Sequence, residues 1–532
     1  MRRRPADEPK IACARPFTPR FHQLVARRLP VGFAACLAAC SILHLTAFAR
    51  DDNPPAPPAP DHALTPPPKP KPDPAVNQPA RASRGPVQMP RAATTPRHNP
   101  RLVASSSAAD APHEHSPVPS PRLRLRDHDG NIVIARLHGR EGNRSAALLP
   151  DGQIGFPQRL IETDEPFRPL TIEALREQLS RSKFTDFQIL QTQHYLIFHQ
   201  SSQRFAAASG KLLEDLYKGL SEWLQRKGVD VADAEFPLVA VIFKTEADFR
   251  AYKPVAPQIQ AYYDLMSNYI FFYEKSDRDE QAPEIAALRK PQTVAHEGTH
   301  QILANLGVQP RLTPWPLWIV EGLAEYCSTP VMNRKGVTNW GGIGLVNPLH
   351  LATIRDLENP VTLQSRGPQP PRKQRMPLVG EIVMRTELSP TDYALAWAMT
   401  HYLATKRSRD FFIYLDRLRE LPPLSERTPA EQLELFRSVF GRDLAKLDKS
   451  VAEHLSKFKK YDTLQVYAVL FERSLGAGAS RRNAIVSQSP SIIRQWIGTM
   501  SENGTAAARW EVMPFPNRAQ AVYTAEQWVH LR

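Results

Sequence analysis

Two histidines and a glutamate occur in the pattern H-E-x-x-H, at His296, Glu297 and His300. On a helix, positions four apart lie one turn apart on the same face, so the two imidazoles can bind one metal ion. Glu297 lies beside this pair, where it can hold a water molecule and accept its proton. Two histidines at this spacing can also be ordinary solvated or core residues. A catalytic zinc ion takes three protein ligands, so a third ligand nearby would favour a metal site.

The third ligand is expected on a second helix, over residues 316–326. Glu321 lies 21 positions after His300, which leaves room for a loop and a return of the chain. Glu321 and Glu325 are four residues apart and share one face, and their neighbours are apolar, so both carboxylates should be buried. A buried carboxylate needs a partner, which a metal ion and its histidine ligands supply. By itself this spacing is more typical of a solvated helix edge; beside the upstream motif it indicates ligation by Glu321.

The two motifs together are similar to those of the gluzincin metallopeptidases. More narrowly, residues 185–465 resemble a bacterial gluzincin-like family of unknown function, which joins a strand-rich segment, an H-E-x-x-H-Q helix and a W-x-x-E-G-x-A-E-Y helix. The resemblance implies one Zn²⁺ ion held by His296, His300 and Glu321, with Glu297 as the general base. Gluzincins often carry an aspartate four residues beyond the ligand glutamate, where it orients the first histidine. Glu325 occupies that position here.

The implied reaction is the hydrolysis of peptide bonds. Zinc lowers the pKa of water towards neutrality, Glu297 accepts the proton, and the hydroxide attacks a polarised carbonyl. Such a site also needs a hydrogen-bond donor for the developing oxyanion. Tyr393 and His401 belong to a stripe that recurs at every fourth position of a later helix, and either could donate. An aromatic stripe of this kind is more often part of a core.

The elements that must position these residues follow from hydrophobic periodicity. Pro291 and Gly307 suggest that the H-E-x-x-H helix covers residues 292–306. Upstream of it, apolar runs predict strands at 187–190, 195–198, 237–243 and 270–273, with a long helix over 205–227. Strands followed by helices favour an α+β fold, with a zincin-like catalytic domain over 171–465. In such folds the strand before the metal helix often pairs with extended substrate, so the tyrosine-rich segments Tyr262-Tyr263 and 269–273 are a candidate edge. Ordinary packing within the sheet is the alternative for these segments.

Two further segments flank the predicted catalytic domain. Residues 121–165 show alternating apolar residues and the turn signals Asp129-Gly130 and Asp151-Gly152, which predict a small antiparallel β module. The C-terminal extension, residues 466–532, is poorly patterned from residue 475. We expect it to be partly disordered, with 476–510 loose.

The first fifty residues have the composition of an export signal or membrane anchor. Eight Arg or Lys lie within residues 2–28, and residues 29–49 carry no charge, the order typical of an export signal. Three outcomes remain open. The chain is cleaved after Ala49, is lipidated at Cys40 in a sequence that resembles a lipobox, or keeps the segment as an anchor. All three would place the protein in the periplasm or cell envelope; the alternative is a cytosolic chain with an unusual N-terminus.

Residues 51–120 are rich in Pro, Ala, Ser and Thr, and 16 of the 51 prolines lie in 51–100. This composition predicts a disordered tether. The first hundred residues also carry nine of the net charge of +14. Nucleic-acid-binding proteins usually carry their basic excess on the folded domain, so no nucleic-acid partner is expected.

The sequence therefore predicts an exported or envelope-tethered zinc peptidase that acts on peptide or protein substrates. The alternative is a non-catalytic envelope protein that uses the same fold for binding or as a scaffold. The long tether, the β module and the C-terminal extension suggest this second interpretation.

Overall fold

The computed structural model describes residues 120–530 except 127–130, 257–258, 277–278, 280–282, 333–337, 359–360, 365–377, 462–463, 477–478 and 503–507. The predictions for residues 1–119, which include the export signal, Cys40 and the Pro-rich tether, lie outside this part of the chain. Among the described residues, no helix is both long enough and apolar enough to cross a membrane.

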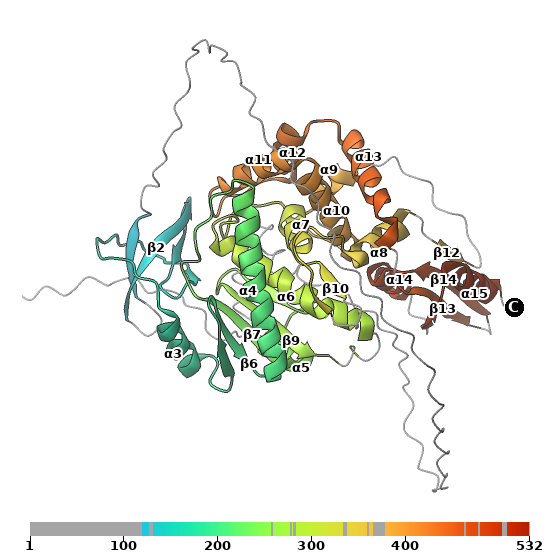
Figure 1. Ribbon diagram of the computed structural model, residues 1–532, viewed down its shortest axis with the longest axis horizontal. Coiled ribbons are helices and arrows are strands. Elements are labelled where there is room, and N and C mark those ends of the chain that lie inside the picture. Colours follow the sequence, from blue (N-terminus) through green and yellow to red (C-terminus); the bar gives the residue numbers. More distant parts are fainter. Residues whose placement is uncertain are drawn as a thin grey trace, which may run out of the picture. The chain divides into compact units, whose positions relative to one another are not determined.

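A five-stranded sheet lies at the centre of the predicted catalytic domain (Figure 1). Its strand order is β5-β6-β7-β9-β8; the three inner strands run parallel, and the edge strands β5 and β8 are antiparallel to their neighbours. Inner parallel strands are buried on both faces, which explains the continuous apolar run of β7. The strands are β5 (Gln188–Gln191), β6 (Tyr195–His199), β7 (Leu238–Thr245), β8 (Tyr262–Asp264) and β9 (Tyr269–Lys275).

Different helices cover the two faces of this sheet. Successive side chains of a strand point to opposite faces, so Ala240 of β7 packs in a cluster with α4 and α6, and Val241 packs with α3 and α5. Figure 1 shows the long helix α4 crossing the strands. These helices are α3 (Ile172–Ser182), α4 (Gln203–Arg226), α5 (Glu246–Tyr252) and α6 (Pro283–Asn305).

Helices dominate the chain from α6 to residue 461, which confirms the predicted α+β class. Helix α10 begins with a capping box, in which Ser389 and Asp392 each satisfy the other's backbone N–H. The further elements of this region are α7 (Leu317–Cys327), β10 (Pro330–Met332), β11 (Thr338–Trp340), α8 (Pro348–Glu358), α9 (Leu378–Val383), α10 (Pro390–Lys406), α11 (Ser408–Arg419), α12 (Pro429–Phe440), α13 (Leu444–Leu455) and the 3₁₀ helix η2 (Ser456–Tyr461).

Helix α6 begins earlier than the sequence predicts, and Pro291 lies inside it instead of at its start. Proline has no N–H to donate to the carbonyl four residues earlier, which belongs to Ala287. The hydroxyl of Thr338 in β11 donates to this carbonyl at 2.6 Å, so the group left by the proline has a partner. The predicted end of the helix is confirmed, because Gly307 follows it with a φ of 70°.

The predicted β module is a four-stranded antiparallel sheet in the order β1-β2-β3-β4. It packs on the loop between α6 and α7: His138 Nε2 donates to the carbonyl of Arg311 at 2.7 Å, and Arg311 Nη2 donates to the carbonyl of Gly152 at 2.8 Å. The turn Asp129-Gly130 lies outside the described residues. The strands are β1 (Arg122–Arg126), β2 (Ile132–Glu141), β3 (Arg144–Leu148) and β4 (Ile154–Gly155).

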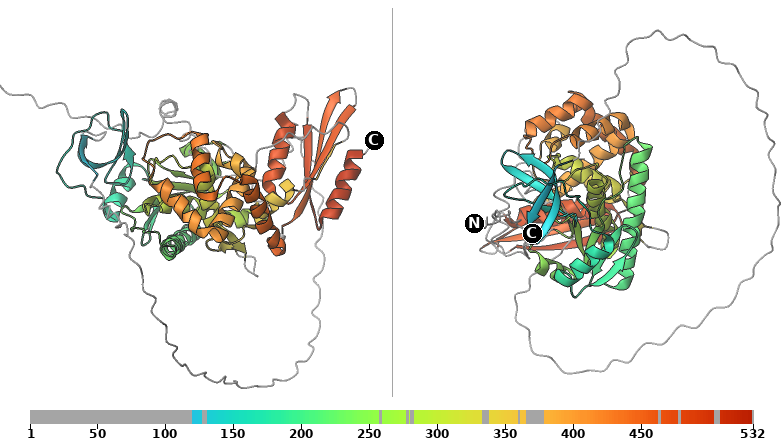
Figure 2. Two further views of the ribbon diagram at one scale, coloured as in Figure 1. Left: turned by 90° about the horizontal axis from the view of Figure 1, so that it is seen from above. Right: turned by 90° about the vertical axis from the view of Figure 1, so that its left-hand side faces the viewer.

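The C-terminal segment differs from the predicted, partly disordered extension. Its described residues form a second antiparallel sheet, in the order β12-β14-β13-β15, with α14 on one face and α15 on the other (Figure 2). We call this assembly the C-terminal unit. Its elements are β12 (Val361–Gln364), β13 (Val466–Gly476), β14 (Ala479–Ser487), α14 (Pro490–Glu502), β15 (Ala508–Phe515) and α15 (Arg518–His530).

Two features explain why the sequence pattern does not predict this sheet. Strand β13 is apolar on both faces, since Ala468 packs with α15 and Val469 with α14, so it lacks the alternation of a half-buried strand. The edge strand β12 also comes from the middle of the chain, about a hundred residues before its neighbour β14. The boundary expected at residue 465 therefore does not separate the C-terminal unit from the preceding domain.

Candidate metal centre

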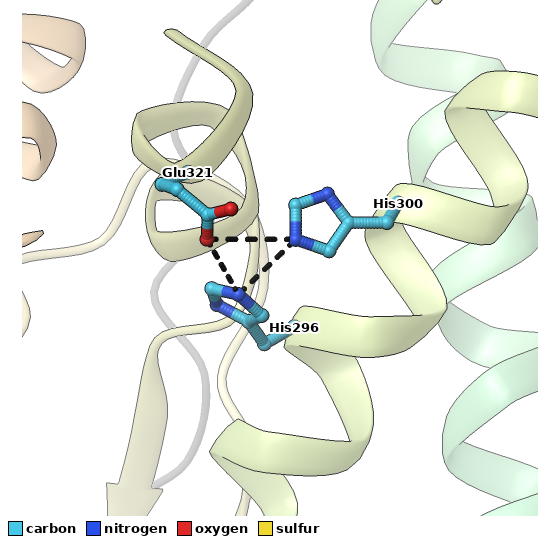
Figure 3. Close-up of side chains that lie close together, drawn as sticks. All are labelled: His296, His300 and Glu321. Atoms are coloured by element: carbon cyan, nitrogen blue, oxygen red, sulfur yellow. Dashed lines mark hydrogen bonds and ion pairs between the residues drawn. The ribbon is translucent and has the colours of Figure 1, made fainter. Parts of the chain in front are cut away.

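The side chains of His296, His300 and Glu321 converge from helices α6 and α7 (Figure 3). The two histidine Nε2 atoms are 3.2 Å apart, and Oε2 of Glu321 lies 3.2 Å from Nε2 of His296 and 3.6 Å from Nε2 of His300. Three atoms about 2.1 Å from one ion, in tetrahedral directions, would be about 3.4 Å from one another. The three side chains could therefore hold a metal ion, and all three are buried.

Glu325 sets the protonation of the first histidine. Its Oε1 atom lies 3.2 Å from Nδ1 of His296. Because an ionised carboxylate only accepts hydrogen bonds, the neutral imidazole of His296 carries its proton on Nδ1 and its lone pair on Nε2. In that form the lone pair faces the carboxylate of Glu321, which is also an acceptor. Either a second proton on Nε2 or a metal ion between the two atoms makes this contact favourable, and two imidazoles with one carboxylate are the donor set of a metal site.

The surrounding charges also favour a cation. Burial lowers the pKa of His296, but the charge of Glu325 and hydrogen bonds to Glu321 and Glu325 outweigh burial and raise the pKa well above 6.5. Burial raises the pKa of Glu321, but the charges and hydrogen bonds of His300 and His296 outweigh it, so this pKa is lowered. The ionised carboxylates of Glu321 and Glu325 thus attract positive charge. A bound metal ion would supply this charge in place of a proton on the histidines.

Two glycines allow the helices to approach closely enough to build the centre. A Cβ atom at Gly322 would lie 2.8 Å from the carbonyl oxygen of Ala396 in α10. A Cβ atom at Gly298 would lie 2.7 Å from Leu213 in α4. The glycine that follows Glu321 and the glycine inside H-E-x-x-H are therefore packing requirements of the site.

Gln301, the residue after the second histidine, fixes α6 to the sheet. Its side chain is completely buried, and Nε2 donates to the carbonyls of Val239 at 3.1 Å and Asn268 at 2.6 Å. These carbonyls belong to β7 and to the turn between β8 and β9. The glutamine of the H-E-x-x-H-Q motif thus positions the metal helix on the central sheet.

Glu297 and Tyr393 lie at the same centre. Glu297 is completely buried, and its charge contributes to the raised pKa of His296. The ring of Tyr393, in α10, is centred 6.4 Å from the ring of His296. The structure therefore brings together the expected general base and one of the two expected oxyanion donors.

His401, the other expected donor, has different surroundings two turns further along α10. Its Nδ1 atom is 2.9 Å from Nε2 of His454, and its ring packs against Trp397 and Tyr326. Burial lowers the pKa of His401 to about 4, and the charge of His454 acts in the same direction. Tyr393, the first member of the predicted stripe, thus has a ring contact with His296, whereas the ring contacts of His401 are with Trp397, Tyr326, His454 and Phe458.

Two residues near the centre were not predicted from the sequence, and both form hydrogen bonds with Glu325. Nε2 of Gln292 donates to Oε2 of Glu325 at 2.8 Å, and Nε2 of His350 lies 2.7 Å from the same oxygen. Gln292 could have been found, because it lies four residues before His296 on the same helix face. His350 belongs to α8, and its distance in sequence from the two motifs matches no known metal-site spacing.

A hollow opens beside two of the three candidate ligands. His300 and Glu321 line it together with Tyr263, from the edge strand β8. The remaining lining residues are mostly apolar. Leu265 comes from the turn between β8 and β9, and the others come from the end of α6, the following loop and the start of α7; they are Ala304, Gln309, Pro310, Arg311, Leu312, Thr313, Trp315 and Val320. Of the two expected tyrosine-rich segments, Tyr262-Tyr263 lies in the edge strand, whereas β9 is an inner strand.

Comparison with known protein families shows a similarity over part of the chain. Residues 290–425 match the model of a family described as a protein of unknown function (DUF1570). No curated protein is significantly similar to the chain. The matched segment contains every residue placed at the centre, namely Gln292, His296, Glu297, His300, Glu321, Glu325, His350 and Tyr393. Over this segment the chain is similar to a family that carries no assigned activity.

Proposed function

We propose that this protein is a zinc-dependent peptidase that is exported or tethered to the cell envelope. The observation that carries the proposal is the convergence of His296, His300 and Glu321 on one point, with Glu297 buried beside them. Two imidazoles, one carboxylate and an open position are the ligand set of a catalytic zinc ion. The resemblance of the two motifs to gluzincin metallopeptidases supports the same reaction.

Zinc, when bound, supplies Lewis acidity that polarises a carbonyl group and lowers the pKa of water. The protein contributes the remaining steps. Glu297 accepts a proton from the attacking water and returns it to the leaving amine; it is buried and directly follows His296 in the sequence, and its charge contributes to the raised pKa of that histidine. Tyr393 donates a hydrogen bond to the developing oxyanion, since its ring lies against the same histidine. His401 has no step in this mechanism.

The substrate in this proposal is a peptide or protein segment in extended conformation. Tyr263 of the edge strand β8 lines the same hollow as His300 and Glu321. An edge strand can hold an extended peptide by main-chain hydrogen bonds, which would bring a peptide bond to the metal. The N-terminal composition supports delivery across a membrane, by a cleaved signal, a lipid at Cys40 or a retained anchor.

The test is the substitution Glu297→Gln in the purified protein. We expect about one zinc ion per chain in both proteins, and a loss of peptide hydrolysis of at least about 100-fold in the variant. Zinc content is measured by elemental analysis, and hydrolysis with a broad peptide library. Glu214→Gln is a matched control, because Glu214 also pairs with a histidine, His194, away from the metal ligands.

Hydrolysis that persists unchanged in the Glu297→Gln protein would contradict the proposal. Zinc bound by a folded wild-type protein that cleaves no peptide would instead favour the non-catalytic binding or scaffold function.

A further inference from the structure

The carboxylate of Glu325 links the candidate metal centre to helix α8. Its Oε1 atom faces Nδ1 of His296 at 3.2 Å, and its Oε2 atom faces Nε2 of His350 at 2.7 Å. The amide of Gln292 donates to Oε2 as well, at 2.8 Å. All four side chains are buried. The orientation of Glu325 thus depends on a donor from α6 and a donor from α8.

We propose that His350 is a positioning residue for the metal centre, and that the C-terminal unit holds it in place through α8. The first part follows from the chemistry of the contact. An ionised carboxylate only accepts, so Nε2 of His350 carries the proton and donates it. This bond fixes Glu325, which in turn fixes the ring of His296 with Nε2 towards Glu321. The ring of His350 packs on Trp397, which limits its own rotation.

The second part of the proposal follows from the contacts at the other end of α8. One oxygen of Asp356 accepts three hydrogen bonds from the turn between β14 and α14: from Ser487 Oγ at 2.6 Å, from the Gln488 N–H at 2.7 Å and from the Ser489 N–H at 3.1 Å. Its other oxygen accepts from Arg518 of α15 at 3.0 Å. Asp356 is buried, so losing these donors would leave an uncompensated charge.

Helix α8 is therefore held at both ends by buried polar groups. His350 lies in its first turn and Asp356 lies six residues later, near its end. Between them, Thr353 Oγ1 is 2.7 Å from Ser489 Oγ of the C-terminal unit. The chain then continues from α8 into β12, a strand of that unit. A displacement of the C-terminal unit would move α8 and with it the donor to Glu325.

The first experiment measures zinc affinity of the full-length protein by competition with a chelator. We compare His350→Ala, His350→Asn and His350→Gln. The amide of Gln can place a donor where Nε2 of His350 lies, whereas that of Asn is too short. Replacing a direct partner of a metal ligand typically costs about 10- to 100-fold in affinity. His350 acts through one such partner, Glu325, so we expect a loss near the lower end, about 10-fold, for Ala and Asn and a much smaller loss for Gln.

The visible spectrum of the cobalt-substituted protein provides a second readout, because it reports ligand geometry. It should change in the Ala and Asn variants and be restored in the Gln variant. Equal affinity and equal spectra in His350→Asn, His350→Gln and wild type would overturn the positioning role, even if His350→Ala failed to fold. Equal losses in the Asn and Gln variants would overturn it too, because they would indicate packing without hydrogen bonding.

The second experiment tests the link to the C-terminal unit with Asp356→Asn. We expect a smaller loss of zinc affinity than in His350→Ala, and no further loss when the two changes are combined, because both act through the same bond to Glu325. Independent losses that multiply in the double variant would overturn the link. This inference rests on the proposed zinc site, but affinity and spectra need no peptidase activity, so its failure is distinguishable from failure of the Glu297→Gln test.

Discussion

Two pairs of buried histidines lie within the same group of helices and differ in their surroundings. His296 and His300 face each other through their Nε2 atoms at 3.2 Å, and His401 and His454 meet at 2.9 Å. The first pair shares its space with three buried carboxylates, which raise the pKa of His296. Around the second pair, burial lowers the pKa of each histidine to about 4, with the nearby Lys406 acting in the same direction.

The two pairs show that two neighbouring imidazoles are not sufficient to make a metal site. Neutral imidazole can donate from one nitrogen and accept at the other, so a single hydrogen bond can join two buried imidazoles without any ion. His401 and His454 are joined in this way. At His296 and His300 the added carboxylates leave more acceptors than donors, and a cation restores the balance. The carboxylates of α7 are therefore what turns a histidine pair into a candidate metal centre.

The largest effect should follow from removing the carboxylate that distinguishes the two pairs. Glu321→Ala leaves both histidines of the centre but removes the third ligand. We expect zinc affinity to fall by more than the roughly 100-fold that an outer partner can cost. Chelator competition measures this loss. Glu214→Ala, which removes a carboxylate from the unrelated pair with His194, should leave affinity unchanged. Wild-type affinity in Glu321→Ala would contradict the assignment of the ligand.

Zinc should also stabilise the folded chain through the first pair alone. A ligand that binds only the native state at about 100 times its dissociation constant adds about 2.7 kcal/mol to the free energy of unfolding. We expect this gain, measured by urea unfolding with and without zinc, in wild type and in His454→Gln. It should disappear in Glu321→Ala. A variant of His454 that loses the gain would show that the second pair contributes to metal binding.

The smallest expected effect is the pH dependence of the second pair. Each histidine of this pair has a pKa of about 4 in the folded protein and about 6.5 in the unfolded chain, so its contribution to the free energy of unfolding is at its maximum above pH 6.5. This contribution is lost as the pH falls towards 4, because the unfolded chain then binds more protons. We expect His454→Gln to reduce this loss by about 1–3 kcal/mol between pH 7 and pH 4.5.

The measurement is urea unfolding of zinc-saturated wild type and His454→Gln at both pH values. Because the metal centre is the same in the two proteins, their difference isolates the second pair. An identical dependence on pH in both proteins would contradict the lowered pKa of His454.

Much of the candidate site could be predicted from the sequence because its residues lie close together along two short segments of the chain. His296, Glu297 and His300 lie on one helix, and Glu321 and Glu325 lie on another, so periodicity alone placed each group on a face. The central strands were visible as apolar runs. Pro291 suggests a helix start that the structure does not have, because Thr338, 47 positions away, donates the hydrogen bond that the proline cannot donate to Ala287. No local pattern indicates this role of Thr338.

The parts that escaped prediction depend on contacts between distant segments. His350 reaches Glu325 only because α8 packs on α10, and its sequence neighbourhood has no metal-ligand spacing. Likewise β12 is a short segment of four residues that becomes a strand by pairing with β14. Periodicity puts His401 on the same helix face as Tyr393 and so makes it a candidate donor, but it does not show which part of that face meets the metal helix.

The origin of β12 has a consequence for how the chain is made. A ribosome releases the chain from its N-terminus, so β12 emerges long before β14, which begins at residue 479. At synthesis rates of about 5–20 residues per second, the interval is on the order of ten seconds. During that time α8 has been synthesised without the sheet that it contacts. If the C-terminal unit positions α8 as proposed, the candidate metal centre is complete only once the last segment of the chain has been synthesised.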